Sequence, residues 1–180
     1  MSTRAALRAR TAEEHERVDA LFGRFDLASE DGYRGFLAAQ AGAFLPIEEA
    51  LDAAGIGDLV PDWHERRRGD ALRADLSRLG VAIPDGAHPV FAGEADVLGA
   101  LYVLEGSRLG GSLLKKSIQA DFPRAFLDAP QPPGAWRKLL ALIDVTLNRP
   151  DQTDRAVEAA CMVFGAFESS GARVLELGRA

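Results

Sequence analysis

The segment Leu104-Glu105-Gly106-Ser107-Arg108-Leu109-Gly110-Gly111 places three glycines inside residues 94–120, a stretch whose pattern otherwise predicts one long helix. Together with Gly99, these glycines cost the helix on the order of 3 to 4 kcal/mol relative to alanine. Residues at i, i+7 and i+11 share a helical face, so Gly99, Gly106 and Gly110 predict one smooth strip along the helix. Either another helix or a flat ligand is expected to press against this strip.

Apolar residues recur at helical spacing on both sides of this segment, and no run longer than a few residues alternates with period two. The fold predicted is therefore all-α, a compact bundle of about six to eight helices. Asp62 with Glu65 resembles a capping box, and Thr153 is expected to cap the last helix. The other helices are predicted over residues 3–25, from Ser29 to Gly55 with a bend at Pro46, from Asp62 to Gly80, and over residues 135–148 and 154–177.

Size and composition limit the classes of function. A chain of 180 residues fits one domain, 1–180, and its single cysteine excludes an internal disulfide. Residues 1–8 lack the apolar segment of a secretory signal, and no apolar run is long enough to cross a bilayer, so we expect a cytoplasmic protein without a membrane partner. The net charge of -6 argues against nucleic-acid binding. The one dense basic run, Arg66-Arg67-Arg68, is predicted to be a solvated helix face.

His15 is the histidine whose position indicates chemistry. It lies three residues before Val18 and seven before Phe22, on the edge of the apolar stripe of the first helix, so we expect it to face the interior. Asp19 lies one turn further on, where its carboxylate could hold one ring nitrogen and direct the other toward a metal. An inward histidine is more often a hydrogen-bonded core residue, and this alternative stays open.

One histidine is too few for a metal site built from protein alone, and the chain contains no Glu-x-x-His, His-x-x-x-His or Cys-x-x-Cys motif. One histidine suffices for a haem iron, because the porphyrin supplies four ligands. Arg8 and Arg4, two and three turns before His15, would place cations near the carboxylates of such a ligand. A histidine helix on one face of a haem and a glycine-rich helix on the other would explain both unusual features.

Three segments resemble the haem oxygenase family, especially its bacterial branch associated with bacteriophytochromes. The segment RTAEEHERVD (residues 10–19) resembles the proximal-histidine helix, YRGFL (33–37) the second helix, and LYVLEGSRLGG (101–111) the glycine-rich distal helix. The similarity extends over nearly the whole chain. It implies a haem oxygenase-like multi-helix bundle in which His15 is the axial ligand of haem b, while Gly106, Gly110 and Gly111 flank the distal face.

The resemblance also implies a reaction. Haem is substrate and cofactor, and with dioxygen and an external electron donor, such as a ferredoxin or a reductase, its ring is opened to biliverdin with release of carbon monoxide and iron. A bacteriophytochrome is a candidate acceptor of the biliverdin. Arg8 and Arg137 are candidates for contact with the haem propionates. Ser107 departs from the animal enzymes, which carry an aspartate at this position, so its hydroxyl is expected to hold a water without supplying the same charge.

Two other functions remain open from the sequence. A haem-binding carrier or sensor would use His15 and the glycine-rich helix without the chemistry. A purely structural reading makes the Gly106-x-x-x-Gly110 spacing a helix contact and His15 a core residue. Turnover of added hemin separates the enzyme from both alternatives.

Overall fold

Residues 2–178 are described by a computed structural model, and within them every regular element is a helix, as the sequence predicts. None of the described helices has the length and apolarity that a bilayer span requires. In chain order the elements are α1 (Thr3–Arg10), α2 (Ala12–Phe22), α3 (Glu30–Ala53), α4 (Ile56–Leu59), α5 (Trp63–Arg66), α6 (Gly69–Arg78), α7 (Glu94–Leu114), the 3-10 turn η1 (Lys115–Ser117), α8 (Ala125–Asp128), α9 (Ala135–Thr146) and α10 (Pro150–Leu177).

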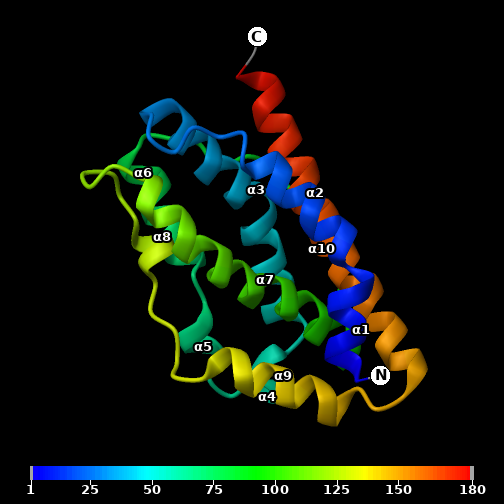
Figure 1. Ribbon diagram of the computed structural model, residues 1–180. Coiled ribbons are helices and arrows are strands. Elements are labelled where there is room, and N and C mark those ends of the chain that lie inside the picture. The colour runs from blue at the N-terminus through cyan, green and yellow to red at the C-terminus, as the bar shows by residue number, and fades with distance from the viewer. Residues whose placement is uncertain (1, 179–180) are drawn as a thin grey trace.

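Helix α10 is the longest element, and α1, α2, α3 and α7 all pack against it (Figure 1). Glycines lie where two of these helices approach it most closely. A Cβ on Gly99 of α7 would overlap the backbone carbonyl of Ala156 in α10. A Cβ on Gly171 of α10 would lie 3.0 Å from Leu21 and 3.1 Å from Phe22 in α2. Helix α10 therefore fixes the positions of both α2 and α7.

The core is one connected cluster of buried apolar side chains with an aromatic group at the α2–α3 end. Phe36 packs with Phe22 and Phe25 at ring-centroid distances of 6.0 and 6.3 Å. Tyr33 is fully buried, and its hydroxyl donates a 2.7 Å hydrogen bond to the carbonyl of Pro123. This bond ties α3 to the segment that follows α7, and burial of each such ring contributes roughly 1.5 to 3 kcal/mol.

Two predicted helices are interrupted. The helix predicted over residues 3–25 is broken at Thr11, whose hydroxyl donates to the carbonyl of Leu7 at 2.8 Å, and it ends at Phe22. The helix predicted from Asp62 is a single turn, α5, and the chain becomes helical again only at Gly69. The predicted capping box is absent, because the Asp62 carboxylate binds Arg66 instead of a backbone N–H.

Other helix ends agree with the sequence only in part. Ser29 caps α3 as predicted by accepting from the N–H of Gly32 at 3.1 Å, and α3 stays helical through Pro46. Helix α7 ends at Leu114, six residues before the predicted end at residue 120. Helix α10 begins at Pro150, where a fixed φ favours a first turn, so Thr153 is not its cap.

Candidate functional site

The glycines of α7 differ in their surroundings. Gly99 is a packing glycine, because its missing Cβ lets α7 approach α10. A Cβ on Gly110 would have no heavy atom within 4 Å, and one on Gly106 would find Trp136 at 3.7 Å. Gly111 is buried in ordinary contact with α8, at 3.4 Å from the Cβ position. At Gly99 the expected partner is therefore another helix, whereas packing does not explain Gly106 and Gly110.

The open side of α7 is apolar. The large side chains of Leu109 and Leu113 are 55% and 69% exposed. With Gly106 and Gly110 they follow the i, i+3, i+4, i+7 spacing of a single helical face. We call these four positions the open face of α7. A contiguous apolar face of this kind, with no side chain at two of its positions, suits a flat apolar ligand.

His15 lies on α2 with a side chain that is 61% exposed, so the prediction that it faces the interior is wrong. Helix α2 buries only Phe22, and its apolar stripe is too narrow to cover a histidine at its edge. The imidazole packs beside Phe164 of α10 at a ring-centroid distance of 5.8 Å. Its Nε2 lies 3.4 Å from Oδ2 of Asp19, so the predicted pairing of these two residues is present. This exposure also removes the core-residue alternative.

Arg8 lies near the start of the open face. Burial raises the pKa of Tyr102 in α7 above its usual value, and the nearby Arg8 guanidinium partly offsets that rise. The Tyr102 ring packs against Trp136 of α9 at 5.4 Å, and Trp136 is also the nearest neighbour of the Cβ position on Gly106. Two aromatic rings thus connect the neighbourhood of Arg8 with the open face, and Tyr102 was not among the predicted site residues.

Arg137 lies apart from the other predicted residues. Its guanidinium folds back over Gly134 at the start of α9, 3.4 Å from the Cβ position there. Within residues 2–178, no hydrogen bond or ion pair joins it to Arg8, His15 or the glycine-rich segment.

The hydroxyl of Ser107 is held by the protein. Its Oγ donates a hydrogen bond to the carbonyl of Leu104 at 2.6 Å and accepts one from Nη2 of Arg68 at 2.9 Å. The same Nη2 donates to the Leu104 carbonyl at 2.9 Å. Because the hydroxyl hydrogen is already used, one lone pair of the Ser107 oxygen remains as an acceptor.

Arg68 is a buried cation that the sequence pattern did not reveal. It is 5% exposed, and its guanidinium lies over the rings of both Phe44 and Phe126, at 4.8 and 4.7 Å from their centroids. Desolvation, followed by the nearby Arg108 cation, lowers the pKa of Arg68 to about 9. Its Nε is buried without a hydrogen-bond partner. Two ring contacts and two hydrogen bonds replace water around this side chain and hold it in one position.

Glu105 lies on the buried side of α7, directly before Gly106. Its carboxylate, 2% exposed, accepts hydrogen bonds from Arg66 at 3.3 Å, Arg108 at 3.2 Å and Gln131 at 2.8 Å. Arg66 in turn makes a two-pronged ion pair with Asp62. This network fixes the first turn of the glycine-rich segment to the segments that precede α6 and α9.

The prediction of a solvated basic face is therefore wrong for Arg66 and Arg68, which are 3% and 5% exposed, and agrees with the structure only at Arg67. Their partners on α7 and α9 lie 36 to 69 residues away in the chain, so no local pattern identifies them. The residue that could have indicated a buried partner in this segment is Glu48. A carboxylate on the apolar side of a helix needs a partner, and it accepts from the backbone N–H groups of Arg68 and Gly69.

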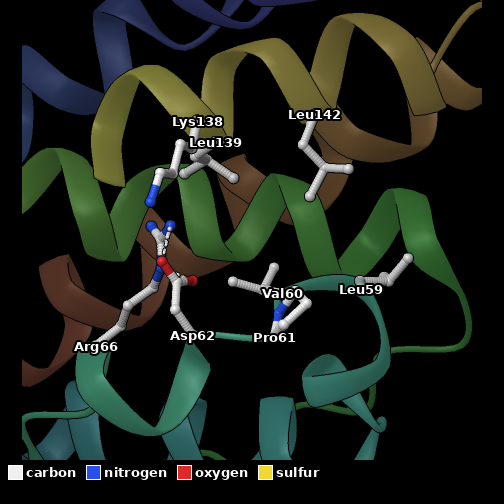
Figure 2. A pocket seen from close by; sticks show the side chains of 8 residues that line it. All are labelled: Leu59, Val60, Pro61, Asp62, Arg66, Lys138, Leu139 and Leu142. Carbon is white, nitrogen blue, oxygen red and sulfur yellow. Dashed lines mark hydrogen bonds and ion pairs between the residues drawn. The ribbon is translucent and has the colours of Figure 1, made fainter. Parts of the chain in front are cut away.

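Two cavities lie elsewhere in the molecule. The first, of about 290 Å³, lies beside α5 and α9, and Figure 2 shows the Lys138 side chain directed toward the paired Asp62 and Arg66. The second, of about 260 Å³, lies between α3, residues 86–89 and α10. Neither is lined by a predicted site residue, so the candidate site is the exposed surface at His15 and the open face of α7.

Known proteins resemble this chain along most of its length, although no protein-family model matches it. It is 32% identical over 183 residues to heme oxygenase PigA of Pseudomonas aeruginosa, with 92% of both chains covered. It is also 32% identical over 113 residues to a heme oxygenase of Xanthomonas campestris, covering 59% of this chain and 68% of the relative.

A solved structure extends the similarity to three dimensions. The NO- and CO-bound heme oxygenase of Neisseria meningitidis matches the fold with a TM-score of 0.82 and 25% identity, over 97% of this chain and 92% of that one. Sequence and fold therefore agree over nearly the same length. The chain belongs to the haem oxygenase family, the oxidoreductases that degrade haem.

Proposed function

We propose that the chain binds haem b between α2 and the open face of α7, with His15 as the axial ligand, and converts it to biliverdin, carbon monoxide and iron. The observation that carries this proposal is the apolar open face of α7, where packing gives no reason for Gly106 and Gly110. When bound, haem supplies both the iron that activates dioxygen and the porphyrin ring that is oxidised.

His15 fits the role of axial ligand because its imidazole is exposed and already has a carboxylate partner. Asp19 beside one ring nitrogen holds the orientation of the ring and leaves the other nitrogen free. The Asp19 contact is at Nε2, so Nδ1 is the nitrogen left free in this rotamer. Phe164 limits the ring to one side of α2. Together these contacts hold the imidazole in one orientation, as an axial ligand requires.

The open face of α7 fits the opposite side of a flat ring. Without side chains at Gly106 and Gly110, the helix backbone can approach the ligand closely and leave room for dioxygen. Leu109 and Leu113 supply apolar contact on the same face.

Ser107 acts as a hydrogen-bond acceptor in this proposal. Its hydrogen is used by the Leu104 carbonyl, so it can hold a water by accepting one of the water hydrogens, and the other water hydrogen is then available to dioxygen. The Arg68 cation behind Ser107 supplies positive charge at the position where the animal enzymes carry an acid.

Arg8 is the better supported of the two proposed propionate contacts, because it is near Tyr102 and so near the open face. Arg137 is supported only by its place beside Trp136 at the start of α9. We also propose that electrons come from a separate donor such as a ferredoxin or a reductase, and that a bacteriophytochrome accepts the biliverdin. Reduction of the haem complex by candidate donors, and transfer of biliverdin to a bacteriophytochrome, test these two partners directly.

The test is turnover of added hemin with a reductant under air. We expect the haem absorption band to fade while a biliverdin band grows, and carbon monoxide and iron to be released in equal amounts. A stable haem spectrum would rule out the reaction. Separation of the biliverdin isomers then identifies which bridging carbon is oxidised.

The role of His15 is tested by His15→Ala, with His64→Ala as the matched control. Both histidines are exposed and lie beside a carboxylate, 3.4 Å away for His15 and 3.7 Å for His64. We expect His15→Ala alone to lose the sharp haem band and turnover, and added imidazole to restore the band. Equal spectra in the two variants would overturn the assignment of His15.

A further inference from the structure

The second cavity lies on the side of α10 turned away from α2. Its walls come from α3, from residues 86–89 and from α10, and its volume is about 260 Å³. Haem is far larger than this space, whereas one aromatic ring with a small polar group fits it. The cavity shares no lining residue with the candidate haem site. Its lining residues are Gly42, Ile47, Gly86, Ala87, His88, Pro89, Met162, Val163, Gly165, Ala166, Ser169, Ser170 and Arg173.

The ionisable side chains that line this cavity are basic. Among its lining residues the ionisable side chains are His88 and Arg173, and none is a carboxylate, although the chain has a net charge of -6. Arg173 uses Nη1 to donate to the carbonyl of Asp85 at 2.7 Å. Within residues 2–178 its other nitrogens have no hydrogen-bond or ion-pair partner, and neither has His88. An anionic group is the complement of such a lining.

The cavity has an apolar end and a polar end. Along α10, Met162, Ala166, Ser169 and Arg173 follow one another at helical spacing, so the lining changes from apolar to hydroxyl to guanidinium. Helices α3 and α10 run antiparallel, since Gly35 lies near Val174 and Gly42 near Ser170. Continuing this pairing places Ile47 at the apolar end, beside Val163.

Gly165 faces the cavity for no reason of packing. It lies in the interior of α10, where glycine lowers helix stability, and a Cβ there would have no heavy atom within 4 Å. The two other lining glycines differ from it. A Cβ on Gly42 would overlap the Ser170 hydroxyl, and one on Gly86 would overlap the backbone of Gly42. Gly165 alone keeps space open that a bound molecule would use.

We propose that this cavity binds a small aromatic monocarboxylate, with its ring at the open position beside Gly165 and Ala166 and its carboxylate at Arg173 and Ser169. The apolar end, the basic end and the open position at Gly165 each match one part of such a ligand. This site is independent of haem binding, because none of its residues belongs to α2 or α7.

Benzoate and its neutral analogue benzamide are the probes, with backbone amide NMR shifts as the measurement. We expect benzoate to bind saturably with a dissociation constant on the order of 1 mM, which is usual for a ligand of this size. The shifts should concentrate at Gly86 and Gly165, and benzamide should bind about tenfold more weakly because it lacks the charge. Equal binding of the two probes, no saturable binding, or shifts located elsewhere would overturn the proposal.

Two variants separate the ionic contact from the available space. Arg173→Gln should weaken benzoate binding about tenfold and leave benzamide binding unchanged. The control Arg149→Gln removes an exposed arginine at the other end of α10, which pairs with Asp151, and should change neither. Gly165→Leu should abolish binding of both probes while the amide spectrum remains that of a folded helical protein. Full benzoate binding by folded Gly165→Leu would also overturn the proposal.

Discussion

Ser107 and Arg68 form a unit at the residue scale. The serine accepts from a guanidinium that itself packs against two aromatic rings, and both side chains bond to the carbonyl of Leu104. A change of the Ser107 χ1 angle that turned Oγ toward a ligand would break both hydrogen bonds of this oxygen, at a cost of roughly 0.5 to 1.5 kcal/mol each. Arg68 therefore keeps Ser107 in its role as an acceptor.

A double-mutant cycle tests this unit. We expect Ser107→Ala to slow hemin turnover on the order of tenfold, and to have little further effect when Arg68→Met is already present, because the two share one hydrogen bond. The coupling energy from initial rates of biliverdin formation should be roughly 0.5 to 3 kcal/mol. Ser77→Ala, an exposed serine on α6, is the control and should leave the rate unchanged. Additive effects of Ser107→Ala and Arg68→Met would contradict the shared bond.

Tyr33 makes the free energy of unfolding depend on pH in the alkaline range. Burial, and after it the nearby Asp75 carboxylate, raises the pKa of Tyr33 well above its usual value of 10.0. Above pH 10 the unfolded chain loses this proton while the folded protein keeps it, so Tyr33 adds stability below pH 10 that is lost as the pH rises further. The decline is about 1.4 kcal/mol for each pH unit once the unfolded group is ionised.

Urea unfolding of Tyr33→Phe near pH 7 and near pH 11 measures this effect. Near pH 7 the variant should be less stable by about 1 kcal/mol, because the hydrogen bond to Pro123 is lost. Near pH 11 the difference should vanish or change sign, since phenylalanine has no proton to lose. A stability difference that is the same at both pH values would show that Tyr33 does not titrate in this way.

At the element scale, α7 combines a half that packs and a half that is open. Gly110→Ala should stabilise the haem-free protein by about 0.5 to 1 kcal/mol, because alanine favours the helix and nothing occupies the Cβ position. The same substitution should weaken haem binding and slow turnover. Gly99→Ala is the opposite case, because its Cβ would overlap α10, and should lose roughly 1 to 3 kcal/mol.

Thermal unfolding with and without hemin measures both changes. The expected result is an opposite sign for the two glycines in the haem-free protein. If Gly110→Ala bound haem and turned it over as the unchanged protein does, Gly110 would have no role in the site.

The buried acid of α7 allows a second prediction at this scale. Glu105→Ala should lower the free energy of unfolding by roughly 3 to 5 kcal/mol, because the buried Arg66 loses a charged partner. Glu105→Gln keeps an acceptor oxygen and should lose less. The control Glu49→Gln, at an exposed pair with Arg73, should change stability by less than about 1 kcal/mol, as measured by urea unfolding. Similar losses in Glu105→Ala and Glu49→Gln would contradict a structural role for this network.

At the scale of the whole molecule, periodicity predicted the helices because each one buries an apolar face. Ser29, Gly80 and the start of α7 at residue 94 lie where the sequence placed them, since caps and glycine turns are local signals. The breaks at Thr11 and between α5 and α6 were missed. At the first break the Thr11 side chain bonds to a backbone carbonyl, and at the second the backbone N–H groups of Arg68 and Gly69 bond to the Glu48 carboxylate. Helix propensity reports neither contact.

The candidate site was predictable to a different degree at each residue. The spacing of His15 and Asp19 is a local property of one helix, and their contact is present. The burial of His15 depends on how α2 lies on α10, so the sequence misjudged it. The burial of Arg66 and Arg68 was missed for the same reason, because their partners lie on α7 and α9, far along the chain.

The glycine contacts of α10 determine the span between the two helices that carry the candidate site. Gly99 against Ala156 sets how close α7 comes, and Gly171 against Leu21 and Phe22 sets how close α2 comes. Helix α10 thus holds α2 and α7 at a set distance from each other. A single added methyl group at either glycine would change the distance between α2 and α7 without altering a residue of the candidate site. The width available to a flat ring therefore depends on helix contacts that lie behind the site.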